Sequence, residues 1–180
     1  RCRRQRQMCI RDRCECFKQH GAHHIRIAKD ATEAAALWQG RKAAFPAVGR
    51  ISPDYYCMDG TIPRSQVGYV LTRISELSQF YGLRVANVFH AGDGNLHPLI
   101  LFDASIDGEL EQAELLGGDI LTLCVDVGGT ITGEHGVGLE KMPQMPYQFG
   151  DAELAQFRRL KAAFDSDELL NPGKAIPTLK

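Results

Sequence analysis

Residues 85–102 read VANVFHAGDGNLHPLILF, and this stretch decides the fold. Two segments rich in β-branched, aromatic and leucine residues flank a short cluster of Gly, Asp and Asn, which is the composition of a hairpin turn. The sequence therefore predicts antiparallel strands over 85–90 and 96–102, joined by a turn over 91–95. His90 closes the first strand and His97 opens the second, so we expect the two imidazoles to lie opposite one another across the hairpin.

Further short strands and four helices are predicted on either side of this hairpin. The strands are expected at 25–28, 55–59 and 130–132. Apolar residues recur at helical spacing over roughly 30–45, 61–81, 109–127 and from 151 onward, and we expect Pro46 and Gly82 to end the first two helices. This order favours an α+β fold: a ferredoxin-like antiparallel sheet with helices packed on one face, plus a C-terminal helical segment.

The composition is that of an ordinary globular chain, with 44% hydrophobic and 24% charged residues among 180. No run of apolar residues approaches the ~18 that a membrane span needs. Six arginines fall in residues 1–16 while the net charge of the chain is −1, so the remainder is mildly acidic, which argues against a nucleic-acid partner. No glycine-rich nucleotide loop follows a predicted strand, so a nucleotide-binding domain is not expected within this chain.

The first twenty residues differ from the rest in composition. Four of the six cysteines lie in residues 1–16, at spacings that match no zinc ribbon or finger. This segment shows neither helical nor strand periodicity. We therefore expect residues 1–20 to be a basic, cysteine-rich leader that is poorly ordered or non-native, with a metal-binding arm as the alternative, and residues 21–180 to form the domain. Cys57 and Cys124, the two cysteines of that domain, suit a reducing compartment such as the cytoplasm.

Chemistry-bearing residues gather at the hairpin and at the later segment GEHGVG, residues 133–138. His90, His97 and a carboxylate from Glu134 make a three-ligand set that leaves an open position on a divalent metal. Adjacent residues on an extended segment point to opposite sides, so Glu134 is expected to face the metal while His135 faces a substrate as general base. The alternatives are a hairpin with two hydrogen-bonded histidines and a tight glycine turn.

Two arginines are candidates for binding an anionic substrate. Arg41 lies one helical turn beyond Trp38, and Arg64 follows Pro63 at the start of a predicted helix. A guanidinium can clamp a carboxylate through two hydrogen bonds, and the alternative for each is a solvated surface arginine. Asn171, in the turn NPGK at 171–174, is a candidate cofactor contact, or part of a turn that ends a helix.

Four motifs in this sequence resemble those of one family. They are GRISPDYYCMDGTIPR at 49–64, VFHAGDGNLHP at 88–98, GEHGVG at 133–138 and LNPGK at 170–174. From about residue 25 to its end, the chain is similar to the C-terminal domain of the glycolate-oxidase type of FAD-linked 2-hydroxy-acid oxidases and dehydrogenases. The resemblance implies that this chain is the ferredoxin-like cap and that the FAD-binding half is missing.

The same resemblance implies roles for individual residues. It assigns a divalent metal (Zn, Mn or Fe) to His90, His97 and Glu134, and the role of base to His135. It also implies that Arg41 binds the carboxylate of the substrate. This sequence has Phe45 and Cys57 where relatives have a threonine and a lysine near that carboxylate, which fits a small substrate.

The implied reaction is oxidation of a small 2-hydroxy acid, of the glycolate or D-lactate type, to the 2-oxo acid with hydride transfer to FAD. The implied partners are the missing FAD-binding half and either other oxidase subunits or a quinone as electron acceptor. A cytoplasmic location is expected, either free or peripheral at the inner membrane, and the chain alone is expected to be inactive. The alternatives are a stand-alone metal-dependent hydrolase and a non-catalytic ferredoxin-like binding module.

Overall fold

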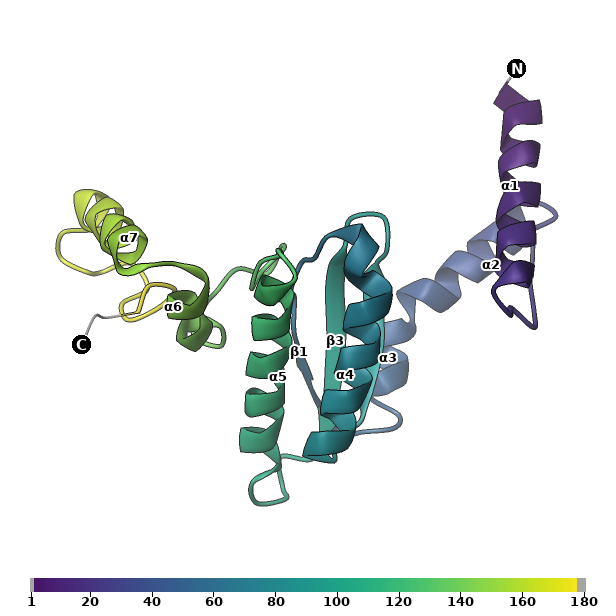
Figure 1. The fold of residues 1–180 in the computed structure, drawn as a ribbon. Coiled ribbons are helices and arrows are strands. Elements are labelled where there is room, and N and C mark those ends of the chain that lie inside the picture. Colours follow the sequence, from purple (N-terminus) through teal and green to yellow (C-terminus); the bar gives the residue numbers. More distant parts are fainter. Residues whose placement is uncertain (1, 178–180) are drawn as a thin grey trace. The chain divides into compact units, whose positions relative to one another are not determined.

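The computed structural model describes residues 2–177 and divides the chain into two compact units, residues 1–43 and 44–180. Figure 1 shows the elements in chain order. The first unit holds two helices, α1 (Cys2–Gln19) and α2 (Ala31–Lys42). The second unit holds α3 (Ala44–Val48), β1 (Asp54–Cys57), η1 (Arg64–Gln66), α4 (Val67–Tyr81), β2 (Val85–His90), β3 (Asn95–Phe102), α5 (Glu109–Asp126), η2 (Met142–Gln144), α6 (Met145–Gln148) and α7 (Asp151–Phe164).

The sheet is antiparallel, with strand order β1-β3-β2, so the hairpin expected from residues 85–102 is confirmed and β3 forms its centre. All eight residues of β3 are buried, which requires cover on both faces of the strand. The α+β class is therefore confirmed. Predicted strands at 25–28 and 130–132 are wrong: the first is irregular chain, and the second forms only an isolated bridge between Thr130 and Thr61.

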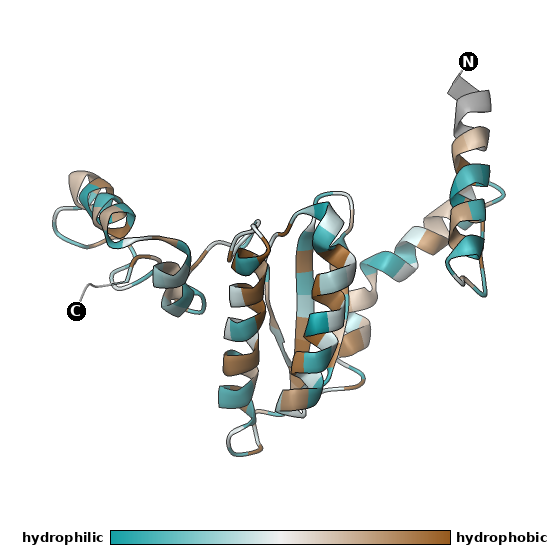
Figure 2. Cartoon of the chain, in the orientation of Figure 1, coloured by the Kyte–Doolittle hydropathy of each residue, from teal (hydrophilic) through white to brown (hydrophobic). Residues whose placement is uncertain are grey.

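Helices α4 and α5 cover one face of the sheet and supply most of the core. Their apolar residues recur at helical spacing, which turns one stripe of each helix inward; Figure 2 shows the apolar side of α5 turned toward the strands. Leu96 and Ile100 of β3 meet this stripe in the main hydrophobic cluster. Helix α4 ends as expected at Gly82, which adopts the left-handed conformation (φ 71°).

The opposite face of the sheet carries a smaller apolar cluster and the candidate ligand His97. Because side chains alternate along a strand, Leu99 and Leu101 point away from the main core and pack against Val48 of α3. Phe45 and Cys57 pack against the same cluster. His97 precedes Leu99 by two residues and so lies on this face as well.

Two boundary expectations are corrected by the structure. Asp30 caps α2, its carboxylate accepting from the Glu33 N–H at 2.8 Å, and the helix ends at Lys42 rather than near residue 45. Pro46 does not end a helix; it lies within α3, where a proline early in the first turn costs little because that N–H has no helical partner.

The N-terminal leader is helical, although its sequence shows no helical periodicity. Residues 2–19 form the helix α1. They contain neither Gly nor Pro, and eight of these eighteen residues are Arg or Gln, which are strong helix formers. A helix can form from such residues without an apolar stripe, so the periodicity test failed here. Among the described residues, no helix has both the length and the apolar character that crossing a membrane requires.

We predict that Gly129→Ala destabilises the second unit by about 1–3 kcal/mol through overpacking. A Cβ at this position would lie 2.0 Å from the Thr61 carbonyl oxygen and 2.7 Å from that of Cys124, and backbone atoms cannot rotate away. Urea unfolding would measure the loss. Gly68→Ala in α4 is the matched control: nothing lies within 4 Å of its added Cβ, so it should stabilise by about 0.5–1 kcal/mol. Equal midpoints for the two variants would contradict this prediction.

Candidate functional site

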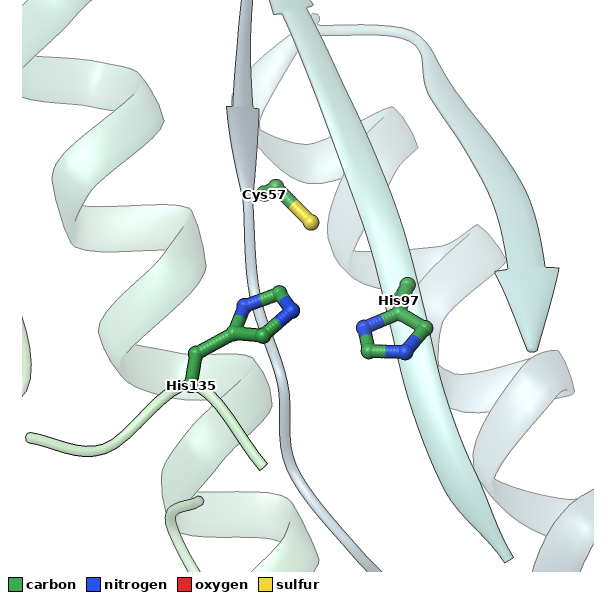
Figure 3. A group of neighbouring side chains, drawn as sticks. All are labelled: Cys57, His97 and His135. Carbon is green, nitrogen blue, oxygen red and sulfur yellow. The ribbon is translucent and has the colours of Figure 1, made fainter. Parts of the chain in front are cut away.

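Three histidines and a glutamate meet at one corner of the sheet, on the face away from α4 and α5. His90 ends β2 and His97 lies on β3, while Glu134 and His135 come from the loop after α5. Figure 3 shows His97 and His135 pointing toward one another, with Cys57 of β1 beside them. The tertiary structure thus brings together four residues that the sequence singled out from two distant motifs.

Glu134 is the centre of this cluster. Its Oε1 lies 2.9 Å from His97 Nε2, and 3.9 Å from both His90 Nε2 and His135 Nε2. The rings of His97 and His135 stack with centroids 4.9 Å apart, and His90 meets His97 edge-on at 5.4 Å. His97 is buried, whereas His90, Glu134 and His135 are about half exposed. The cluster is therefore anchored on a buried imidazole and open to solvent on its other side.

The two hairpin histidines are not opposite one another, as the sequence analysis expected. In the strand register, Val88 pairs with His97 and His90 pairs with Asn95. The turn is one residue shorter than predicted because Asn95 belongs to β3. His90 and His97 are therefore diagonal neighbours on one face, a position from which aromatic rings still meet.

The loop that carries Glu134 and His135 is wrapped around the buried carboxylate of Asp59. Consecutive N–H groups of Gly133, Glu134 and His135 donate to Asp59 Oδ2 at 3.1, 3.1 and 2.8 Å. Thr132 Oγ1 donates to the same oxygen at 2.7 Å. Such a run of N–H groups around one anion is a backbone nest, and it bends the segment tightly. The expected extended geometry is therefore wrong: the side chains of Glu134 and His135 both reach His97 rather than facing opposite ways.

Lys141 completes the support of this loop. Its Nζ lies 3.0 Å from Asp59 Oδ2 and 3.3 Å from Thr132 Oγ1, and both charged side chains are almost fully buried. Burial alone would raise the pKa of the Asp59 carboxyl. The hydrogen bonds from the His135 N–H, the Thr132 hydroxyl and the Lys141 ammonium outweigh burial and hold that pKa well below its usual value. Asp59 is thus a fixed anion.

Sequence reasoning missed Asp59 and Lys141. Asp59 stands 82 positions before Lys141 in the chain, and neither belongs to a spacing that indicates a site. The available signal was weak: an acidic residue at the end of a predicted strand, within the motif at 49–64. Only the folded chain shows that the two are paired and buried.

The donor set of His90, His97 and Glu134 fits a divalent metal. Two imidazoles and one carboxylate are the ligands that Zn, Mn and Fe share, and three protein ligands leave a position for a reacting molecule. A small cavity of about 290 Å³ adjoins this set and is lined by polar groups, including Asn95 and Asp93 as well as His90 and Glu134. The fit rests on the chemistry of the side chains. Among the described residues, the ligand atoms that all lie within 4.8 Å of one another belong to Asp59, His97, Glu134 and His135, so His90 would have to move closer to join the set.

Cys57 and Phe45 border the same corner. The Phe45 ring meets His97 edge-on with centroids 6.5 Å apart. Burial, followed by the nearby Asp59 charge, raises the pKa of the Cys57 thiol to about 11. The thiol is therefore neutral near pH 7, and these two side chains make that edge of the site uncharged.

The remaining predicted site residues are not part of the histidine cluster: Arg64 and Asn171 lie elsewhere in the second unit, and Arg41 lies in the first. Arg64 is exposed in η1, its side chain close to Gly94 of the hairpin turn. Arg41 is exposed on α2, in the first unit. Asn171 lies in the C-terminal segment, in the left-handed conformation (φ 49°) that asparagine tolerates, and lines a cavity of about 870 Å³. That cavity is largely apolar; its walls include Val137, Phe149, Phe157, Leu160, Phe164 and Leu170.

Comparison with known proteins shows which family the chain resembles in sequence. A sequence model described as "FAD linked oxidases, C-terminal domain" matches residues 3–175. This match extends into the first twenty residues, which the motifs alone had left unmatched.

Individual relatives agree with this match. The glycolate oxidase subunit GlcD of Escherichia coli is 65% identical over 159 residues, which cover 88% of this chain and 32% of that protein. GlcD of Bacillus subtilis is 36% identical over 157 residues, covering 87% of this chain and 33% of that protein. The mitochondrial D-lactate dehydrogenase [cytochrome] of Arabidopsis thaliana is 32% identical over 160 residues, covering 88% and 28%. The chain therefore spans about a third of the length of these relatives.

We predict that Lys141→Met destabilises the chain by about 3–5 kcal/mol, because it leaves the Asp59 carboxylate buried without its cation. The remaining N–H and hydroxyl donors to Asp59 place the expected loss at the lower end of that range. Chemical denaturation monitored by circular dichroism would measure it. Arg159→Met on the exposed side of α7 is the control and should change stability by less than about 0.5 kcal/mol. A Lys141 variant as stable as this control would show that the pair contributes nothing.

A second prediction concerns pH and the segment that leads to Asn171. The Lys161 ammonium and the N–H groups of Leu170 and Leu169 lower the pKa of the Asp165 carboxyl against the opposing effect of burial. In the unfolded chain this group titrates near about 3.9, so it contributes stability above that pH, and the contribution is lost as pH falls through the lower folded value.

The measurement is the free energy of unfolding between pH 2.5 and 6 (roughly the window set by these values). In the Asp165→Asn variant, the free energy of unfolding should fall less steeply below about pH 4. Asp107→Asn, at an exposed aspartate, should leave the profile unchanged. A wild-type profile with the same slope as Asp165→Asn would contradict the assignment.

Proposed function

The chain belongs to the family of FAD-linked oxidases, matching their C-terminal domain, and from this premise we propose that it is part of a flavin-dependent oxidoreductase. The proposed reaction oxidises a small 2-hydroxy acid, of the glycolate or D-lactate type, to the 2-oxo acid. The single observation that carries the proposal is the convergence of His90, His97 and His135 on Glu134.

His90, His97 and Glu134 are proposed to hold the divalent metal, a Zn, Mn or Fe ion. A bound ion would act as a Lewis acid that polarises the substrate hydroxyl. His97 is buried and fixed on β3, so it sets the position of the site. His90 and Glu134 are half exposed and complete the set from the hairpin end and the loop.

His135 is proposed as the general base that takes the hydroxyl proton. Its Nε2 faces the cluster, 3.9 Å from Glu134 Oε1, and its side chain is about half exposed, so a substrate from solvent can reach it. Its backbone N–H is held by Asp59, which fixes the residue without using the ring. The FAD of the intact protein would accept the hydride from the carbon that bears the hydroxyl.

Arg41 and Arg64 are proposed to bind the substrate carboxylate, since each is an exposed guanidinium group that forms no ion pair with any of the described residues. Phe45 and Cys57 present uncharged surface beside His97. This edge of the site offers no further cation or hydroxyl that could bind additional polar groups of a substrate. It therefore suits a small substrate that carries only a hydroxyl and a carboxylate. Glycolate is the simplest such acid.

The remaining partners are proposed from the length of the relatives. About two thirds of such a protein lies outside this chain, and we propose that this part binds FAD, with Asn171 contributing a cofactor contact beside its large apolar cavity. Other oxidase subunits or a quinone would accept the electrons. The proposed location is the cytoplasm, either free or peripheral at the inner membrane.

The test is a chimera in which this chain replaces the matching segment of the Escherichia coli subunit. It should reduce an electron-accepting dye with glycolate as substrate. His135→Gln should lower kcat by about 10²–10⁴-fold, the usual contribution of a general base, with metal content unchanged. Glu134→Gln should lower metal content as well as activity.

His23→Gln, at an exposed histidine outside the cluster, is the matched control and should keep both activity and metal. A flavin-loaded chimera whose His135 and Glu134 variants keep full activity would refute the proposed roles. Hydrolysis of an ester by the chain with metal and without flavin would favour the hydrolase alternative instead.

A further inference from the structure

A second set of ligand atoms shares the corner with the proposed metal site but differs in chemistry. Cys57, His97 and His135 each offer one ligand atom, and these atoms all lie within 4.8 Å of one another. Figure 3 shows the thiol of Cys57 and the two rings directed at a common space between β1, β3 and the loop after α5. The thiol brings a soft ligand that the set of His90, His97 and Glu134 lacks.

The two nitrogens of His97 face different neighbours, and in the neutral ring only one of the two carries a proton. Nε2 lies 2.9 Å from Glu134 Oε1. A carboxylate only accepts, so this close contact is attractive when Nε2 carries the proton, and Nδ1 then holds the lone pair. Nδ1 is buried and has no hydrogen-bond partner among the described residues; the nearest acidic oxygen, Asp59 Oδ1, is 3.9 Å away.

An unpartnered lone pair on a side chain that is only 4% exposed is costly. Asp59 Oδ1 cannot relieve it, because that oxygen is 3.9 Å away and a carboxylate oxygen only accepts hydrogen bonds, so two acceptors face one another. A cation placed beside Nδ1 would satisfy it. Nδ1 lies on the side of the ring that faces Cys57 and His135 in Figure 3.

We propose that Cys57, His97 Nδ1 and His135 form a binding site for a thiophilic divalent cation such as zinc, separate from the His90–His97–Glu134 site. On binding, the Cys57 thiol releases its proton to water and coordinates as thiolate. The two neutral imidazoles coordinate through their lone pairs, and water fills the fourth position of the ion. The step changes no oxidation state.

The ligand atoms must draw closer when an ion binds. Zinc lies about 2.3 Å from sulfur and about 2.0–2.1 Å from nitrogen, so at the tetrahedral angle two of its ligand atoms are separated by about 3.3–3.6 Å. The His135 ring, which stacks on His97 with an interplanar angle of 16°, must turn its lone pair toward the ion. The side chain of His135 is about half exposed and can rotate toward the ion, while His97 stays fixed. Burial raises the pKa of the Cys57 thiol to about 11, so the thiol is neutral until a cation stabilises the thiolate.

The two sites exclude one another because they share His97. A neutral imidazole has one lone pair, so coordination at Nδ1 leaves Nε2 protonated and directed at Glu134, and coordination at Nε2 leaves Nδ1 protonated. An ion in the thiol site also occupies His135. If the proposed function holds, such an ion inhibits the reaction by removing its base and one ligand of the other metal.

Cobalt(II) titration of the 180-residue chain tests the site directly, without activity. The four leader cysteines, Cys2, Cys9, Cys14 and Cys16, are first replaced by serine so that they cannot bind the probe. Thiolate coordination should produce a charge-transfer absorption band in the near ultraviolet. Cys57→Ser, which preserves size and fold, should abolish the band, and zinc added in equal amount should displace it.

Two control variants separate this site from its neighbours. Cys124→Ala removes a buried thiol on α5 and should keep the band. Glu134→Gln removes the charge needed by the other site but retains an oxygen that accepts from Nε2, and it should also keep the band. A band that survives Cys57→Ser, or no band in the folded starting chain as judged by circular dichroism, overturns the proposal. Loss of the band in Glu134→Gln would assign the cobalt to the other site and overturn it as well.

Discussion

The buried carboxylate of Asp59 holds the loop of the candidate site in place. It accepts from three consecutive loop N–H groups, from Thr132 and from Lys141, with neither partner of the ion pair exposed to water. An anion in such a place is stable only when its oxygens are satisfied, and the loop satisfies them by directing its N–H groups at Asp59. This arrangement of the loop delivers Glu134 and His135 to His97.

Strand β3 gives the site its other fixed element. Alternation along the strand sends Leu96 and Ile100 into the main core and His97, Leu99 and Leu101 to the opposite face. The same burial that stabilises the sheet therefore fixes His97 beside the second apolar cluster, against Phe45. His97 has one nitrogen toward Glu134 and the other toward Cys57 and His135, so a single rigid ring can belong to a hard or a soft ligand set. The choice between the two depends on which nitrogen carries the proton.

Much of the site was predictable because its residues lie in short motifs with strong local signals. The hairpin, helices α4 and α5, and the candidates His90, His97, Glu134 and His135 all follow from turn composition, periodicity and a Glu-His pair between glycines. Details that depend on backbone geometry were not predictable. The register placed His90 diagonal to His97 because Asn95 joined the strand, and the nest around Asp59 bent a loop that was expected to be extended.

The sequence by itself determined the α+β class, the central hairpin and the chemical identity of the candidate ligands, because local propensity and spacing act between residues near in the chain. The tertiary structure alone decided the partnership of Asp59 with Lys141, the shared side of Glu134 and His135, and the approach of Cys57 to the two imidazoles. These contacts join residues far apart in the chain. Their physical cause is the burial of charge and polar groups, which selects partners by proximity in space and leaves no periodic trace in the sequence.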